Sequence, residues 1–123
     1  MEPPLSILLE EKKRYPKKYN LAFHLAAIAA NGKDEAIEDS PITGVIERIL
    51  INFSSATGLA DVSFFIEEKK ILPDNRTVLS LTGTTQKFTV NRPVQENDRI
   101  IFKATNNDSS ALRIDAVVEI TET

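Results

Sequence analysis

Apolar and polar residues alternate along most of the chain between Thr43 and Thr121. A period of two buries one face of a β-strand and leaves the other face in water, which is typical of antiparallel sheets. The pattern therefore predicts a strand at each alternating stretch. The inward positions, which we expect to form the core, are Ile49, Ile51, Phe53, Val62, Phe64, Ile66, Phe88, Val90, Ile100, Phe102, Leu112, Ile114, Ala116, Val118 and Ile120, and a shorter alternation contains Leu79 and Leu81.

Polar clusters rich in turn-forming residues separate these stretches, at positions 54–58, 73–75, 82–85, 95–98 and 106–110. Strands that follow one another every 8–12 residues or so indicate a sandwich or barrel, whereas βαβ units would need intervening helices. Pro93 has no N–H, so its strand should end there or lie at a sheet edge. The chain is thus predicted to be all-β, an antiparallel β-sandwich of roughly seven or eight strands.

Four apolar residues interrupt the polar faces of these predicted strands: Leu50, Phe65, Ile101 and Val117. Each of them is expected either to help form a second buried surface or to serve as an exposed contact point.

We predict two parts of the chain. Residues 1–18 form an N-terminal arm, and residues 19–123 form the sandwich domain. Leu5, Leu8 and Leu9 share one face of a short amphipathic segment that Pro16 would stop. About ten residues cannot hold a helix alone in water, so this segment needs a surface to lie on. That surface could belong to the same sandwich or to a neighbouring subunit.

Residues 19–30 fit two structures. As a strand, Tyr19, Leu21, Phe23 and Leu25 alternate with polar or small residues; as a helix, Leu21, Leu25 and Ile28 form a stripe and the alanines favour it. We favour the strand because the strands downstream need partners. The following Asn-Gly pair would serve as a hairpin turn, or as a helix C-cap in the other case.

Composition excludes several classes of protein. A chain of 123 residues is one domain, and with no cysteine it has neither disulfides nor thiolate metal sites. The net charge of −3 argues against a general nucleic-acid binder. No stretch approaches the roughly 20 apolar residues of a membrane span, and the acidic start does not resemble a secretory signal.

Charge is nevertheless concentrated in two segments, one basic and one acidic. The basic residues are Lys12, Lys13, Arg14, Lys17 and Lys18, and the acidic ones are Asp34, Glu35, Glu38 and Asp39. Two interpretations remain open: solvated loops that at most attract each other within one molecule, or a basic arm that docks on an acidic partner surface.

No catalytic, cofactor or metal-binding residue emerges from the sequence, and we expect a protein that is not an enzyme. His24 is the single histidine, and no G-x-S-x-G motif accompanies it. The four glycines are isolated, so no phosphate-binding loop is present. The acidic cluster and the turn 106–108 lack the spacing of an EF-hand, and the asparagines of that turn are better explained as residues that bond their own main chain.

The segments 41–53, 58–62 and 71–73 resemble small β-sandwich structural proteins of viruses, phages and related particles. The later segment, from residue 97 through the turn 106–108 to the alternating strand 111–121, looks like the closing hairpin of such a domain. The resemblance covers about residues 41–121. It implies a jelly-roll-like fold and a structural or attachment role in a virion, particle or filament, and it assigns no site residue. Without a signal or a membrane span in the sequence, a cytoplasmic location is the other expectation.

Two functions from different classes follow. The first is a self-associating structural protein whose arm docks on another copy or another structural protein, without nucleic acid, membrane or cofactor. Its predicted contact residues are Leu5, Ile7, Leu8, Leu9, Lys12, Lys13, Arg14, Lys17, Lys18 and Phe65. The alternative is a β-sandwich module that binds a glycan, but the chain has no tryptophan, and Phe65 is the one aromatic residue on a predicted polar face.

Overall fold

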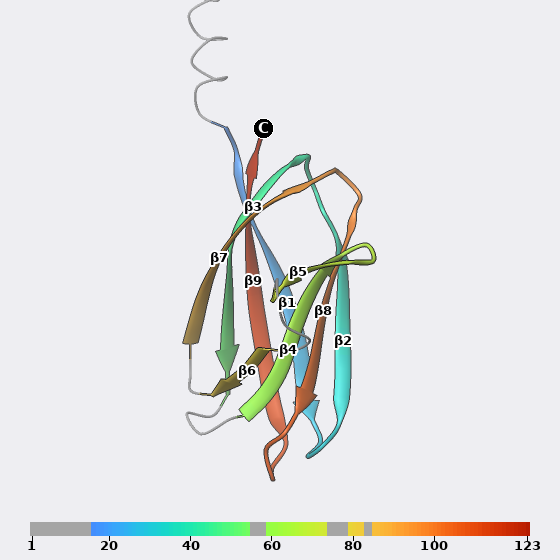
Figure 1. Cartoon of the computed structure of the whole chain (residues 1–123), viewed down its shortest axis with the longest axis vertical. Coiled ribbons are helices and arrows are strands. Elements are labelled where there is room, and N and C mark those ends of the chain that lie inside the picture. The colour runs from blue at the N-terminus through green and yellow to red at the C-terminus, as the bar shows by residue number, and fades with distance from the viewer. Residues whose placement is uncertain (1–15, 55–58, 74–78, 83–84) are drawn as a thin grey trace, which may run out of the picture.

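The computed structural model describes residues 16–54, 59–73, 79–82 and 85–123, and these form nine β-strands (Figure 1). The strands are β1 (Lys18–Ile28), β2 (Lys33–Asp39), β3 (Gly44–Phe53), β4 (Leu59–Ile66), β5 (Lys69–Leu72), β6 (Leu79–Thr82), β7 (Thr85–Val94), β8 (Arg99–Asn106) and β9 (Leu112–Glu122). The predicted arm falls almost wholly on residues 1–15, outside the described part of the chain, so the division into arm and sandwich remains a prediction.

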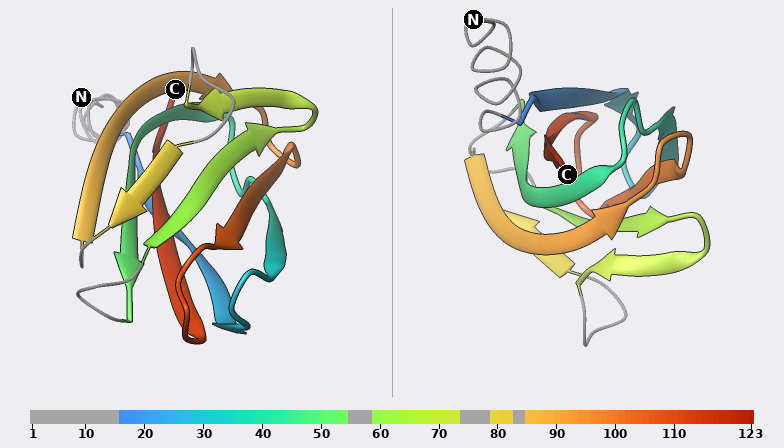
Figure 2. Two further views of the ribbon diagram at one scale, coloured as in Figure 1. Left: turned by 60° about the horizontal axis from the view of Figure 1, so that its bottom comes forward. Right: turned by 90° about the horizontal axis from the view of Figure 1, so that it is seen from above.

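Two antiparallel sheets pack face to face, as the views in Figure 2 show. Sheet A has the strand order β1-β9-β3-β7, and sheet B has the order β2-β8-β4-β5, with β6 also paired to β4. Successive strands mostly alternate between the two sheets, and only the β4–β5 and β5–β6 connections stay within one sheet. This strand order is that of a jelly roll, and the predicted all-β antiparallel sandwich is confirmed.

Several details of the prediction are confirmed and others are wrong. Within the segment 19–30, residues 19–28 lie in strand β1, as favoured, and Pro93 lies near the end of edge strand β7. The charged segment 33–39 is a strand, not a loop, and β5 was not foreseen, so the described residues hold more strands than expected. The predicted closing hairpin is wrong, because β8 and β9 belong to different sheets.

The core lies between the two inner faces and is organised around three phenylalanine rings. Phe64 and Phe102 are opposite each other on β4 and β8, and their rings stack with centroids 4.5 Å apart. Phe23, from β1 in sheet A, meets both rings edge-on at 5.6 and 6.3 Å. All three side chains are fully buried, so the cluster joins sheet A to sheet B.

The predicted core residues are buried with three exceptions. Ile66, Phe88 and Val90 are only partly buried, although they pack against the core. Phe88 and Val90 lie on β7, an edge strand of sheet A, and Ile66 is the last residue of β4. Alternation identifies the inward face of a strand but not its position in the sheet.

One end of the sandwich is fastened by a buried asparagine. Asn106 is 0% exposed, and its side-chain amide donates to the carbonyls of Ile28, Ala29 and Ser110 at 2.9, 3.2 and 2.9 Å. Its side-chain oxygen accepts from the Asp108 amide at 2.8 Å, so the predicted local bond of this turn is confirmed. The turn after β1 and the turn after β8 are therefore held together by one polar group.

We expect Phe102→Ala to lower the free energy of unfolding by about 3–5 kcal/mol, because it removes a fully buried ring from the stacked pair. Urea denaturation monitored by circular dichroism measures this loss. Phe65→Ala, at a half-buried ring on the outer face, should cost less. A loss below about 1 kcal/mol for Phe102→Ala would contradict the described packing.

Asn106→Ala should destabilise the fold by about 2–4 kcal/mol, because buried carbonyls lose their donor. The neighbouring exposed Asn107 provides the matched control, and Asn107→Ala should change stability by no more than about 0.5 kcal/mol. The same denaturation measurement applies. Equal effects of the two substitutions would show that the buried amide does not fasten the two turns.

Candidate interaction surface

The outer face of sheet B carries a row of apolar side chains across three neighbouring strands. Ile37 on β2 pairs with Ile101 on β8, and Ile101 pairs in turn with Phe65 on β4. Cross-strand partners point to the same side of a sheet, so the three side chains form one continuous row. Ile37 is 47% exposed, and the other two are half-buried. We call these three residues the apolar row.

Two lysines cover the Phe65 end of the apolar row. The ammonium group of Lys103 lies 4.9 Å from the centre of the Phe65 ring, and that of Lys70 lies 5.8 Å from it. A cation over an aromatic face is attracted by the negative charge of that face. The Phe65 end of the row is therefore electropositive and partly shielded, whereas the Ile37 end is open.

Strand β2, at the edge of this sheet, is acidic on both of its sides: by register Glu35 and Asp39 share the outer face with Ile37, whereas Asp34 and Glu38 point to the opposite side. Asp34, Glu35, Glu38 and Asp39 are exposed, and within the described residues none of these carboxylates forms an ion pair. β2 has a sheet neighbour only on the β8 side, and charged side chains on such a strand discourage random pairing with other chains. This acidic edge is therefore an uncompensated negative surface next to Ile37.

Arg99, the register partner of Asp39 on β2, interacts with a different carboxylate, that of Glu67. Its backbone amide donates to the Glu67 carboxylate at 2.6 Å, and its guanidinium lies 3.4 Å from the same group. The backbone hydrogen bond, followed by the charge of the guanidinium, holds the pKa of Glu67 below its usual range. Arg99 thus pairs with the β4–β5 turn and leaves the acidic edge unneutralised.

A shallow groove runs beside the apolar row on the same face. It crosses β2, β8 and β4 and is lined by charged and hydroxyl side chains, among them Lys33, Glu35, Asp61, Ser63, Lys103 and Thr105. Its polar lining could hold an extended hydroxylated ligand.

The outer face of sheet A differs, because its charges are paired. Arg48 lies 2.8 Å from Glu119, and Asp115 accepts contacts from His24 Nδ1 at 2.8 Å and Arg113 Nε at 3.2 Å. Leu50 and Val117 are cross-strand partners and half-buried between these polar rows. His24 points outward, with 65% of its side chain exposed.

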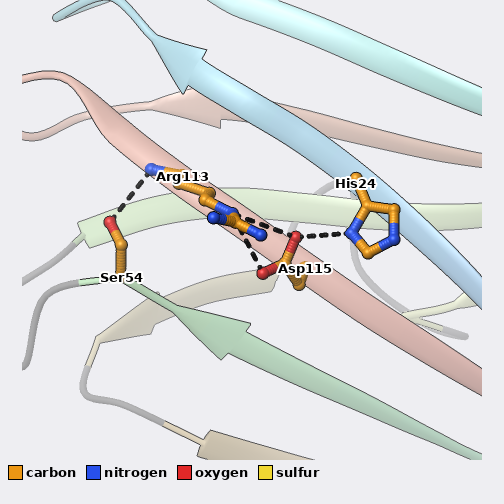
Figure 3. A network of polar contacts seen from close by, with 4 residues as sticks. All are labelled: His24, Ser54, Arg113 and Asp115. Atoms are coloured by element: carbon orange, nitrogen blue, oxygen red, sulfur yellow. Dashed lines mark hydrogen bonds and ion pairs between the residues drawn. The ribbon is translucent and has the colours of Figure 1, made fainter.

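His24, Asp115 and Ser54 occur in one network but are not arranged as a catalytic triad (Figure 3). Ser54 and His24 lie on opposite sides of Arg113 and Asp115, and the Ser54 hydroxyl oxygen accepts from the Arg113 backbone amide at 3.1 Å. A nucleophile would have to contact the other imidazole nitrogen. In the described ranges, His, Asp and Glu side chains do not gather in a group of three that could hold a metal ion.

Among the predicted contact residues, Lys17 and Lys18 are exposed at the start of β1, and Phe65 lies in the apolar row. The other predicted contacts, Leu5, Ile7, Leu8, Leu9, Lys12, Lys13 and Arg14, lie outside the described residues. Ile37 was missed because the charged residues around it hid a strand. On a strand, Ile37 shares one face with Glu35 and Asp39, so no alternation of apolar and polar residues marked it in the sequence.

In the part of the chain that the structure describes, no helix is long and apolar enough to cross a membrane. No family model and no curated protein sequence matches the chain.

Solved structures share the fold. The mitogen from Yersinia pseudotuberculosis aligns with a TM-score of 0.51 at 11% identity, over 88% of this chain and 87% of its own. FlhE aligns with a TM-score of 0.50 at 8% identity, over 86% and 97%. A chain of the cyanophage Pam1 capsid aligns with a TM-score of 0.50 at 11% identity, over 87% and 84%. The resemblance to viral β-sandwich proteins thus holds for the fold, which these differently named proteins have in common.

Proposed function

We propose that this protein is a non-enzymatic structural subunit that associates with copies of itself in a virion-like particle or filament, its N-terminal arm docking on a neighbour. The observation that carries the proposal is the outer face of sheet B, where the apolar row lies next to an acidic edge without ion pairs. A sheet face that exposes apolar side chains in continuous contact is a common mark of a protein interface.

The arm has the composition that such a face would accept. Its apolar residues, Leu5, Ile7, Leu8 and Leu9, precede its basic run. Each apolar side chain buried against a neighbour could contribute about 1.5–3 kcal/mol before the cost of ordering the arm. That cost leaves a weak single contact, which becomes useful when many copies engage at once in a repeated assembly.

The core that the described residues form between the two sheets supports this role. Strand β1 is tied in at its start by the bond from the Glu122 amide to the Lys17 carbonyl, 2.8 Å long. In the proposal, the arm that precedes this bond serves another molecule.

We expect the full-length protein to form oligomers, and the variant Leu5→Ser, Ile7→Ser, Leu8→Ser, Leu9→Ser to be monomeric with an unchanged circular dichroism spectrum. Size-exclusion chromatography with light scattering, over a concentration series, measures both. A wild-type protein that stays monomeric throughout the series would refute self-association. A variant that assembles normally would show that the contacts lie outside the arm.

A second candidate function is a ligand-binding module, and the groove beside Phe65 favours it. Glycans usually stack on aromatic rings, but Lys103 and Lys70 occupy positions over the Phe65 ring. We therefore expect no saturable binding on a glycan array or in calorimetry. If the monomeric protein bound a glycan, and Phe65→Ala abolished this binding while Phe88→Ala retained it, ligand binding would replace the structural role as the proposed function.

A further inference from the structure

We infer that the arm docks on a second copy, on the outer face of sheet B at the Ile37 side. The leucines of the arm cover the apolar row, and its basic run lies along the acidic edge. This inference rests on the proposed self-association and names the partner surface.

Charge fixes which part of the surface receives which part of the arm. Lys103 and Lys70 stand over Phe65, so the basic run would be repelled from that end of the row. At the other end, Glu35 and Asp39 flank Ile37 on the same face of β2, are exposed and form no ion pair among the described residues. The basic run therefore belongs at β2, and the leucines extend from there across Ile37 and Ile101.

The length of the arm suits this placement. Fifteen residues precede the described chain, which at about 3.3 Å per residue could span roughly 50 Å when extended. The three strands of the row are only about 10 Å apart in total, at 4.7–4.9 Å per neighbouring pair. Only part of the arm is needed to cross the row, and the remainder can bridge the distance between two molecules.

Sheet A offers a weaker alternative on its outer face. Its charged side chains are neutralised within the sheet, as in the Arg48–Glu119 and Arg113–Asp115 pairs, and its apolar pair Leu50 and Val117 is half-buried between them. A basic arm would gain little there, because the Glu119 and Asp115 carboxylates already have cationic partners.

The apolar part of the inference is tested by Ile37→Ser in the full-length protein. The concentration for half-assembly in analytical ultracentrifugation should rise by about tenfold or more, since the most exposed member of the row is lost. Leu59→Ser is the matched control, because Leu59 is the other exposed large apolar side chain of the described residues and lies outside the row. It should leave assembly unchanged.

The electrostatic part is tested by a charge swap. Glu35→Lys with Asp39→Lys, and separately Lys12→Glu with Lys13→Glu, should each weaken assembly by about tenfold. Combining all four substitutions in one chain recreates opposite charges between copies and should restore assembly to within about threefold of wild type. Simple destabilisation of the fold would not be rescued in this way.

The outcomes separate the inference from the proposed function. If the wild type assembles through its arm but Ile37→Ser and the charge swaps have no effect, the arm docks elsewhere and only this inference fails. If the wild type does not assemble, both fail. If the effects of the charge swap do not depend on protein concentration, the arm docks on the sandwich of its own chain. That result would overturn docking on a second copy.

Discussion

The contact between the two inner sheet faces is the interaction on which the rest of this protein depends. Six of the eight connections between the described strands pass from one sheet to the other, so sheet A has no two consecutive strands, and in sheet B only β4, β5 and β6 follow one another. Phe64 and Phe102 stack within sheet B, and Phe23 of sheet A packs edge-on against both rings. Burial of these rings together with the surrounding aliphatic side chains is what makes the two layers a single cooperative unit.

Polar groups complete the ends of the sandwich, where connections leave the core. At one end, Asn106 satisfies carbonyls from the turn after β1 and from the turn before β9. At the other, the backbones of Ser40 and Asn97 bond between two turns, and the Ser40 hydroxyl donates to the Ile42 carbonyl. The Ser40 bonds lie at the end of the β2–β8 ladder, and the register of that ladder brings Ile37 beside Ile101.

The two outer faces have the same alternation but different electrostatics. On sheet A, acids and bases are close enough to neutralise one another, as His24 and Arg113 do around Asp115. On sheet B, the acids collect at the β2 edge, while the lysines stand over Phe65. The separation of charge and the exposed Ile37 distinguish this outer face, on which the proposed docking rests, within a fold that is otherwise common to unrelated proteins.

The sequence by itself determined the fold class and most of the core, because alternation directly reflects which face of a strand is buried, as at Ile114 and Val118. It also singled out Phe65 as an aromatic residue on a polar face. Only the tertiary structure decided that β2 is a strand, since an edge strand exposes most of its side chains and carries little hydrophobic pattern. It likewise decided that Ile37 and Phe65 share one row, because strand order across a sheet is set by long-range packing that local periodicity does not encode.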